Sequence, residues 1–176
     1  RYQNNIHDFV AGNQARRYQP TVSGNHGRIQ RNDAETMTDK DRFADWKFPE
    51  IIDGKPTQYG WIVQNKEHFS LGYKTDIGAF TYINAKCGVI IKDFVQVGSH
   101  CSIYSVSTID QKQGKVLLKE NCKIGSHSTV MPGVSVGKNS IVGAHSFVNS
   151  DIPDNVVAMG VPAKVTRKLN IHHEPK

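Results

Sequence analysis

Three histidines in the second half of the chain are spaced so that they could act together. His100, His127 and His145 each follow an aliphatic residue by three positions. His127 and His145 are eighteen residues apart, and His100 precedes His127 by eighteen residues plus the nine residues 109–117. An imidazole accepts a proton near neutral pH and is also a common zinc ligand. The spacing is therefore compatible with general-base catalysis, with metal binding, or with side chains that simply suit a turn.

A six-residue repeat explains this spacing. Its aliphatic positions form one unbroken run and two earlier, shorter ones: Leu118, Ile124, Val130, Val136, Val142, Val148; Leu71, Ile77, Ile83; and Ile91, Val97, Ile103, Ile109. Four positions after each member of the long run comes a second small or aliphatic residue: Cys122, Ser128, Val134, Ser140, Ser146, Ile152. A fixed short period is typical of a solenoid, in which each unit buries its apolar edge against its neighbours.

The repeat predicts a three-sided coil with six residues on each side. Residues eighteen apart then lie above one another, separated by about 4.8 Å, the spacing of neighbouring strands. Val97, Ile124 and Val142 should therefore stack inside the coil, and the three histidines should stack along one corner. Glycines such as Gly98 and Gly125 follow the aliphatic residue, where they let neighbouring coils approach closely.

The pattern divides the chain into four parts. We interpret residues 1–36 as a polar arm, either derived from an expression vector or weakly ordered, because they lack a helical or strand period. Large apolar residues at 37–62 predict a cap over the first coil. The repeat domain spans 63–169 with a polar loop at 109–117, and 170–176 form a short tail.

Composition excludes several functions. The chain has 176 residues and a formal charge of +6, but its basic residues are scattered and not interleaved with aromatics, which argues against nucleic-acid binding. No apolar run is long enough for membrane insertion. The spacing of Cys87, Cys101 and Cys122 fits neither a zinc site nor a disulfide framework, so we expect three small core residues in a cytoplasmic protein.

The later repeats resemble a known family. The segments that carry the resemblance are Ile124-Gly125-Ser126-His127, Met131-Pro132-Gly133-Val134, Ile141-Val142-Gly143-Ala144, Asp151-Ile152-Pro153 and Gly160-Val161-Pro162-Ala163-Lys164-Val165. They are similar to bacterial sugar acetyltransferases of the hexapeptide-repeat family, over about 65–169. The resemblance implies an all-β, left-handed parallel β-helix, a homotrimer, and acetyl-CoA as acyl donor.

The same resemblance implies a cofactor site. In the family, coenzyme A lies along the coils in a groove between two subunits, near the late turns and the basic closing segment. The matching positions here are Ser126, Gly143, Ala144, Val161, Ala163, Lys164 and Arg167. Lys164 and Arg167 would pair with phosphates, one as a point charge and the other as a fork; their alternative role is a solvated surface.

The acceptor site is implied less completely. Asn84 matches an acceptor-binding asparagine of the galactoside enzymes, although asparagine also fills turns. Where those O-acetyltransferases have a catalytic histidine, this chain reads Ser107-Thr108-Ile109, so His100 or His127 would replace it as the base. Around Ser99-His100-Cys101-Ser102-Ile103-Tyr104 the chain also resembles N-acetyltransferases of nucleotide-linked amino sugars, whose amine is a competent nucleophile without a dedicated base.

We therefore expect an N-acetyltransferase that acts on an amino sugar, free or nucleotide-linked, for a surface polysaccharide such as lipopolysaccharide. The alternative is a sugar O-acetyltransferase. A rival of another class is a non-catalytic β-helix or a metal-binding one like the hexapeptide-repeat carbonic anhydrases. Those enzymes use two histidines five residues apart, a pair that the repeat region lacks, so no metal site is predicted.

Overall fold

The computed structural model describes residues 43–170. Within them the chain winds into a three-sided coil, and its strands form three sheets that we number in chain order. Sheet I contains β1 (Ile62–Gln64), β4 (Tyr82–Asn84), β7 (Ser102–Tyr104), β10 (Thr129–Val130) and β13 (Phe147–Val148). Sheet II contains β2 (Phe69–Leu71), β5 (Val89–Ile91), β8 (Val116–Leu118) and β11 (Ser135–Val136). Sheet III contains β3 (Asp76–Ile77), β6 (Gln96–Val97), β9 (Lys123–Ile124), β12 (Ile141–Val142), β14 (Val156–Met159) and β15 (Lys164–Lys168).

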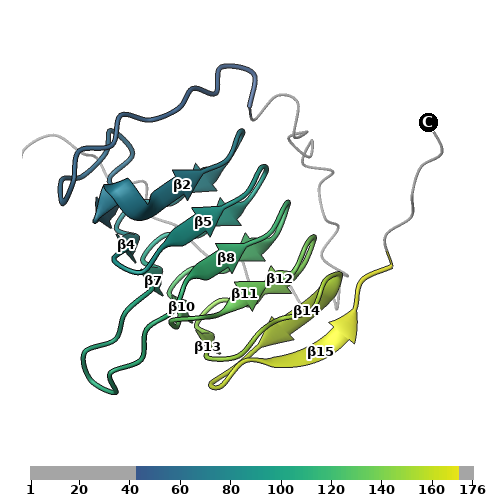
Figure 1. Cartoon of the computed structure of the whole chain (residues 1–176). Coiled ribbons are helices and arrows are strands. Elements are labelled where there is room, and N and C mark those ends of the chain that lie inside the picture. The colour runs from purple at the N-terminus through teal and green to yellow at the C-terminus, as the bar shows by residue number, and fades with distance from the viewer. Residues whose placement is uncertain (1–42, 171–176) are drawn as a thin grey trace, which may run out of the picture. The chain divides into compact units, whose positions relative to one another are not determined.

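The sheets are parallel because each coil repeats the direction of the one before it. Among the strands of residues 43–170, only the pair of β14 and β15 is antiparallel, and β15 closes the end of the stack opposite β2 (Figure 1). A single turn of 3₁₀ helix, η1 (Lys66–His68), joins β1 to β2. The architecture is the expected all-β, left-handed parallel β-helix. No helix in residues 43–170 is long and apolar enough to cross a membrane.

The predicted register is confirmed inside the coil. Val97 pairs with Ile124, and Ile124 pairs with Val142, so the three side chains lie above one another. The whole run from Leu118 to Val148 is at most 2 % exposed. These short aliphatic side chains fit a narrow interior in which alternate residues of each strand point inward.

The second inner column is also buried, and its serines are hydrogen-bonded. Ser128 and Ser146 both donate their hydroxyls to the carbonyl of Gly143, and Ser140 donates to that of Pro153. A buried hydroxyl without a partner would destabilise the fold, whereas these satisfy backbone carbonyls at the corners. Serine can therefore replace an aliphatic residue in this column.

Neighbouring coils touch most closely at the glycines that follow the aliphatic residues. A Cβ atom added to Gly98 would lie 2.5 Å from the backbone nitrogen of Ser126, and one added to Gly125 would lie 2.3 Å from that of Ala144. Backbone cannot move aside at such distances without separating the coils. Glycine is required here for space.

At the corner between sheets II and III, side-chain amides form hydrogen bonds from one coil to the next. The Asn121 amide nitrogen donates to the Asn139 oxygen at 3.0 Å, and the Asn139 nitrogen donates to the Asn155 oxygen at 2.9 Å. We call these three residues the amide ladder. All three have positive φ angles, which asparagine tolerates better than most residues.

The loop between β7 and β8 differs from the prediction. It leaves the coil at Val106 and returns at Gln113, which form an isolated antiparallel bridge, and Val116 is already paired in β8. The predicted bounds of 109–117 are therefore shifted. Ile109 was expected in the inner column but is 97 % exposed near the loop's tip, because the chain turns outward three residues before it. Figure 1 shows this loop projecting from the coils.

The segment predicted as a cap, 37–62, contains both buried and exposed aromatic residues. Residues 37–42, like the predicted arm at 1–36 and the tail beyond 170, lie outside the described residues. Phe43 and Trp61 are buried, and Trp46 packs edge-on against Tyr73 at 5.1 Å. Three other large apolar residues of this segment are exposed: Phe48, Ile52 and Tyr59.

The cysteines follow the prediction with one exception. Cys101 and Cys122 are buried, and burial raises the pKa of both thiols, that of Cys122 to about 12. Cys87 was also expected in the core, but it is only half-buried at a corner, where its backbone N–H bonds to the Ser105 hydroxyl. All three are free thiols.

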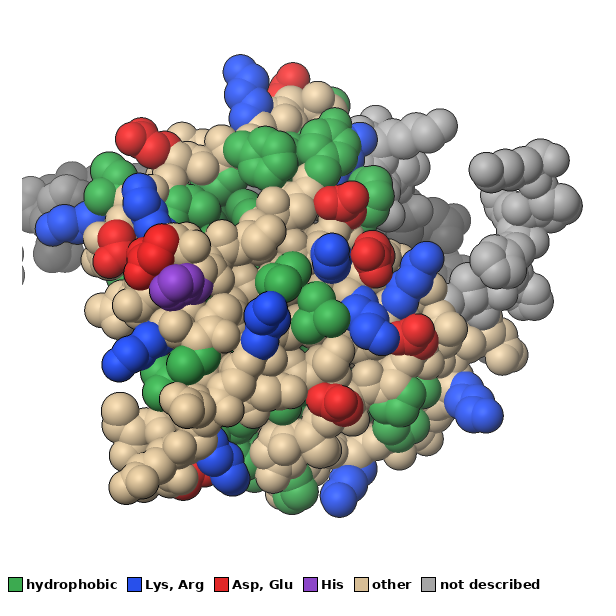
Figure 2. All heavy atoms as spheres, in the orientation of Figure 1, with side chains coloured by type: hydrophobic (Ala, Val, Ile, Leu, Met, Phe, Trp, Pro, Cys, Tyr) green, Lys and Arg blue, Asp and Glu red, His purple; other side chains and the backbone are tan. Residues whose placement is uncertain are grey.

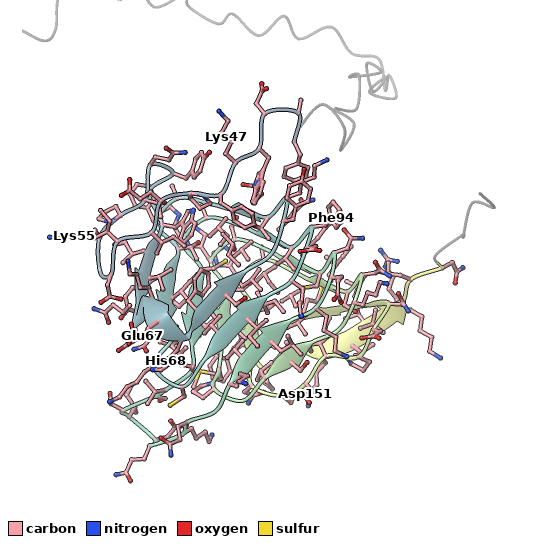
Figure 3. The ribbon with its side chains drawn as sticks, turned by 45° about the horizontal axis from the view of Figure 1, so that its top comes forward. Lys47, Lys55, Glu67, His68, Phe94 and Asp151 are labelled. Carbon is pink, nitrogen blue, oxygen red and sulfur yellow. The ribbon has the colours of Figure 1, made fainter. Side chains whose placement is uncertain are left out.

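The outer faces carry mixed charges. On the face formed by β2, β5 and β8, lysines and carboxylates are interspersed rather than sorted by sign (Figure 2). Figure 3 shows Glu67 and His68 projecting together from η1. This face has the character of a solvated surface.

The register predicts a sharp difference between two adjacent leucines of β8. Leu118 is fully buried, whereas Leu117 lies on the outer side of the same strand and is half-buried. Leu118→Ala should lower the free energy of unfolding by about 2–5 kcal/mol, because it opens a cavity between coils. Leu117→Ala should cost less than about half as much. Urea unfolding followed by circular dichroism measures both, and equal losses would contradict the assignment of inner and outer positions.

Candidate functional site

The predicted histidine column exists. His100 and His127 stack with ring centroids 4.7 Å apart and planes inclined by 13°, and His127 and His145 stack at 4.9 Å and 3°. The column also has a fourth ring, which the sequence analysis missed: Phe80 lies 4.8 Å from His100, tilted by 34°. We call these four residues the ring ladder. Phe80 could have been found by position, because it occupies the same corner one coil earlier.

Backbone geometry at the corner between sheets III and I sets the ladder. All four residues have φ angles between 56° and 63°, in the left-handed region. Each backbone N–H donates to the preceding coil, as His100 does to Ala79 and His127 does to Ser99, both at 3.0 Å. The identical turns hold the side chains outward in parallel, one coil apart, so their spacing follows from that of the strands.

The ladder is poorly suited to bind a metal. A zinc ion needs imidazole nitrogens that converge at about 2.0–2.1 Å, but face-to-face rings direct their nitrogens along parallel lines. Among residues 43–170 no group of three or more His, Cys, Asp or Glu side chains could hold a metal ion. The histidines instead present ring edges to solvent, since all three are exposed.

A pocket of about 570 Å³ lies on the outer face of sheet I under the projecting loop, and its lining reaches to within two residues of the ladder along the chain, at Thr129 and Phe147. Its lining includes Asn84, Tyr104, Ser107, Asp110, Thr129 and Phe147. We call it the sheet I pocket. Outward-facing strand residues form its floor and the loop forms its wall. The Phe147 ring and several polar side chains therefore line the same space.

Asn84 lies in this pocket, as its predicted role requires. Its side-chain oxygen also accepts a hydrogen bond from the Lys86 backbone N–H at 3.1 Å, which is the turn-forming role considered as the alternative. The bond from Lys86 uses the oxygen, and the Asn84 side chain also hydrogen-bonds to Tyr82. The two roles are compatible because an amide nitrogen carries two N–H groups, so a second one can donate to a ligand. No histidine lines the pocket, so the structure does not gather Asn84 with His100 and His127 in one cluster.

The loop contributes a carboxylate that the sequence analysis did not single out. Hydrogen bonds from the Ser107 hydroxyl and from Lys112 lower the pKa of Asp110 to about 2. Its Oδ2 atom lies 3.0 Å from Nζ of Lys112. Asp110 is thus a fixed negative charge at the pocket wall across the whole neutral range. No repeat signal marks it, because it lies in the inserted loop.

Tyrosines continue the outer face of sheet I towards the cap. Tyr82 and Tyr104 lie one coil apart with ring centroids separated by 5.9 Å. Desolvation and the neighbouring Tyr104 raise the pKa of Tyr82, and its hydroxyl hydrogen-bonds to the Gln64 side-chain oxygen. This strip is aromatic with hydroxyl and amide groups at its edge, a combination that suits sugar rings.

On the other side of the ring ladder, a groove of about 320 Å³ runs over sheet III. Gly78, Gly98, Gly125 and Ser126 line it together with outward strand residues. Small residues leave room for an extended ligand to lie against the coils. Of the predicted cofactor residues, Ser126 lies in this groove.

The backbone N–H groups of Gly143 and Ala163, which the family resemblance places near the cofactor, are already hydrogen-bonded within the fold. Gly143 donates its N–H to Ala158, and its carbonyl accepts two serine hydroxyls. Ala163 is 4 % exposed and donates its N–H to Phe147 at 2.8 Å. Neither N–H is therefore available to donate to a cofactor.

The other predicted cofactor positions are accessible. Ala144 and Val161 are exposed, and Lys164 and Arg167 are exposed on β15. The two basic side chains lie on the antiparallel strand that ends sheet III, beyond the sheet III groove. A chain of accessible groups thus extends from Ser126 towards the C-terminal hairpin.

The sheet III groove and the sheet I pocket lie on either side of the corner between sheets III and I. Ser126 lines the groove on one side, Thr129 lines the pocket on the other, and His127 lies between them in sequence, on the corner itself. This arrangement can hold one substrate on each side of a ring edge. It is suited to transfer of a group from one bound molecule to the other.

Comparison with known sequences agrees with the repeat. Residues 115–150 match the family described as bacterial transferase hexapeptide (six repeats). A galactoside O-acetyltransferase from Lactococcus lactis is 38 % identical over 114 residues, 56 % of this chain and 55 % of that protein. The Escherichia coli galactoside O-acetyltransferase is 34 % identical over 123 residues, 61 % of each. The chain thus spans little more than half the length of these relatives.

Comparison with solved structures agrees with the fold. A galactoside acetyltransferase in complex with coenzyme A has a TM-score of 0.58 and 28 % identity, over 62 % of this chain and 60 % of that one. An N-acyltransferase from Bacillus cereus, solved with dTDP and 3-hydroxybutyryl-CoA, has a TM-score of 0.55 and 22 % identity, over 65 % and 79 %. The repeat match, the relatives and the coils agree: residues 115–150 carry the hexapeptide repeat, and the chain is similar, in sequence over little more than half its length and in its left-handed β-helix fold, to acetyltransferases of this kind.

Proposed function

We propose that this protein transfers an acetyl group from acetyl-CoA to the amine of an amino sugar, free or nucleotide-linked, for a surface polysaccharide such as lipopolysaccharide. The observation that carries the proposal is the pair of spaces on either side of the His127 corner. Acetyl-CoA would occupy the sheet III groove and the sugar would occupy the sheet I pocket. Holding both substrates at one corner would supply much of the acceleration.

The donor site follows the accessible positions. Lys164 and Arg167 would bind the phosphates of coenzyme A, and Ala144 and Val161 would contact the chain that leads to Ser126 and the thioester. Gly143 and Ala163 would contribute shape, since their N–H groups are engaged. The coenzyme A bound by the galactoside acetyltransferase, which is 28 % identical, supports this choice of donor.

The acceptor site follows the sheet I pocket. The Asn84 amide would donate to a sugar hydroxyl, and the Asp110 carboxylate would accept a hydrogen bond from the acceptor amine. Because the pKa of Asp110 is about 2, the carboxylate is ionised whenever the amine is reactive, and it would orient the amine rather than deprotonate it. Ser107 and Lys112 are positioning residues that hold this carboxylate.

The chemical step needs only the two substrates and one proton acceptor. The neutral amine attacks the thioester carbonyl carbon, the C–N bond forms, the C–S bond breaks, and coenzyme A leaves as a thiolate. The amine proton passes to the ring edge of His127, with His100 as the other candidate, and from there to the thiolate or solvent. A turn N–H would stabilise the oxyanion that forms on the carbonyl oxygen.

The pocket favours an amine over a hydroxyl acceptor. A sugar hydroxyl must lose its proton as it attacks, which needs a base inside the pocket; no histidine lines it, and a carboxylate whose pKa is about 2 is a weak base. A neutral amine loses its proton only after the C–N bond has formed, so a histidine at the corner outside the pocket can still receive that proton. The second candidate is O-acetylation of a sugar, which the names of the two galactoside O-acetyltransferases favour.

Assembly and location belong to the same proposal. A homotrimer would bring the sheet III groove of one subunit against its neighbour and cover it, which is how an open groove becomes a site that excludes water. Sedimentation velocity measures the number of subunits. Three free thiols are consistent with a reducing cytoplasm.

One assay separates the two acceptor classes. The purified protein, given acetyl-CoA, should release free coenzyme A with a 4-amino-4-deoxy sugar or its nucleotide-linked form, at a rate at least about tenfold above that with the matching hydroxyl sugar. Thiol release measured by a chromogenic reagent reports both rates. Preference for the hydroxyl sugar would establish the O-acetyltransferase alternative, and no release with any acceptor would refute the proposed function.

The fixed charge of Asp110 predicts a loss that does not depend on pH. Because its folded pKa is lowered to about 2, Asp110 does not titrate between pH 5 and 9. Asp110→Asn should reduce kcat/KM for the amine acceptor by about tenfold or more, with an unchanged profile shape. Glu67→Gln, on exposed η1, is the control. An unchanged kcat/KM in Asp110→Asn excludes its role.

The basic strand predicts a donor-specific effect. Arg167→Ala should raise KM for acetyl-CoA by about two- to fivefold without changing kcat, since an exposed phosphate contact contributes little. Added salt should shrink the difference. Lys168→Ala alters the adjacent side chain of β15 and serves as the matched control. Equal effects of the two substitutions would indicate a general charge effect, and no effect would exclude Arg167 from the donor site.

A further inference from the structure

The ring ladder ends in an open ring face. Phe80 is its first member; His100 covers one face, yet Phe80 remains 70 % exposed. The next position along this corner is Gly60, whose carbonyl accepts the Phe80 N–H at 2.9 Å and whose φ of 79° matches the left-handed turns of the ladder. Because Gly60 has no side chain, the ladder stops one ring short of the first coil.

The vacant position has the dimensions of a ring site. Successive ladder members lie 4.7–4.9 Å apart, which is one coil, and the missing member leaves the same interval above Phe80. A flat aromatic group would fit there as a fifth ring. An aromatic face in water gains free energy when another aromatic ring covers it, and stacking of this kind tolerates different ring chemistries.

The distance between Phe80 and the sheet I pocket indicates which flat group of a ligand would stack on Phe80. Asn84 ends β4 and Phe80 lies in the turn just before it, four residues earlier, so their Cα atoms are at most about 13 Å apart. Tyr82 lies between them, and its hydroxyl faces outward next to Gln64. A sugar in the sheet I pocket would reach Phe80 only through a linker of this length. The ribose and diphosphate of a nucleotide-linked sugar form such a linker, and its far end is a flat base.

We propose that Phe80 stacks on the nucleobase of a nucleotide-linked amino sugar whose sugar ring occupies the sheet I pocket; this rests on the proposed function. Tyr82 lies between Asn84 and Phe80 in the chain, and its hydroxyl would contact the linker. Phe80 would strengthen binding of pyrimidine and purine nucleotides alike, because it meets only the flat face of the base.

Titration calorimetry on the intact chain tests this with two nucleotides and a ligand that lacks a base. UDP and GDP should each bind Phe80→Ala about tenfold or more weakly than the unaltered protein, whereas pyrophosphate should bind both equally. Phe80→Trp should retain the affinity. Phe94→Ala is the matched control, because Phe94 has the same left-handed turn (φ 61°) on another corner, beside the cap (Figure 3).

Three results would overturn the inference: equal nucleotide affinity with and without the Phe80 ring, no nucleotide binding by the unaltered protein, or a smaller oligomer in sedimentation when Phe80 is removed. The last would mean that another copy of the chain covers the ring. Acetylation of a free amino sugar distinguishes the two proposals. If it proceeds while nucleotides do not bind, only this inference fails; if no acceptor is acetylated, the proposed function fails.

Discussion

The hydrogen bonds between successive coils are the constraint on which the rest of the structure depends. Each strand from β1 to β13 contributes only two or three residues to its sheet, so no coil is stable alone, and its backbone groups are satisfied only by the coils above and below. This pairing fixes both the rise and the rotation of the chain. Any side chain at a given corner is therefore repeated in direction by the residue one coil later, whatever its chemistry. The ring ladder, the amide ladder and the glycine contacts are three results of the same pairing.

The sequence predicted what the repeat controls and missed what interrupts it. The inner column from Leu118 to Val148 and the histidine column follow from period alone, because burial in a narrow coil permits few side chains. Ile109 shows the limit: it has the right type and spacing, but hydrogen bonds such as that from Ser107 to Lys112 hold its segment outside the coil. Those contacts involve polar residues without a period. Asp110 was not predicted for the same reason, because it lies in this loop. Phe80 was not predicted because the histidine column was identified by residue type instead of by position in the coil.

The sheet III groove and the sheet I pocket lie on different faces of the coil and differ in their lining. Sheet III offers small residues and a smooth groove, whereas sheet I offers aromatic rings, amides and a loop with a fixed carboxylate. The corner between them is rigid, because its turns are hydrogen-bonded to the coil on each side. Of the residues implied by the family resemblance, Asn84 and Ser126 lie in these spaces. Gly143 and Ala163 instead serve the fold with their backbone N–H groups, a distinction that requires coordinates.

The position of the inserted loop follows from the two ladders. Two edges of the coil carry side chains in contact from turn to turn, rings on one and amides on the other. Extra residues on either edge would break a ladder in the middle. The loop leaves from the third edge, where corner residues such as Lys86 and Gly133 form no such ladder in residues 43–170. Variation in loop length, and with it the shape of the sheet I pocket, can accumulate at that edge while the other two stay intact. The shape of the pocket can therefore change without disturbing the contacts between coils that hold the fold together.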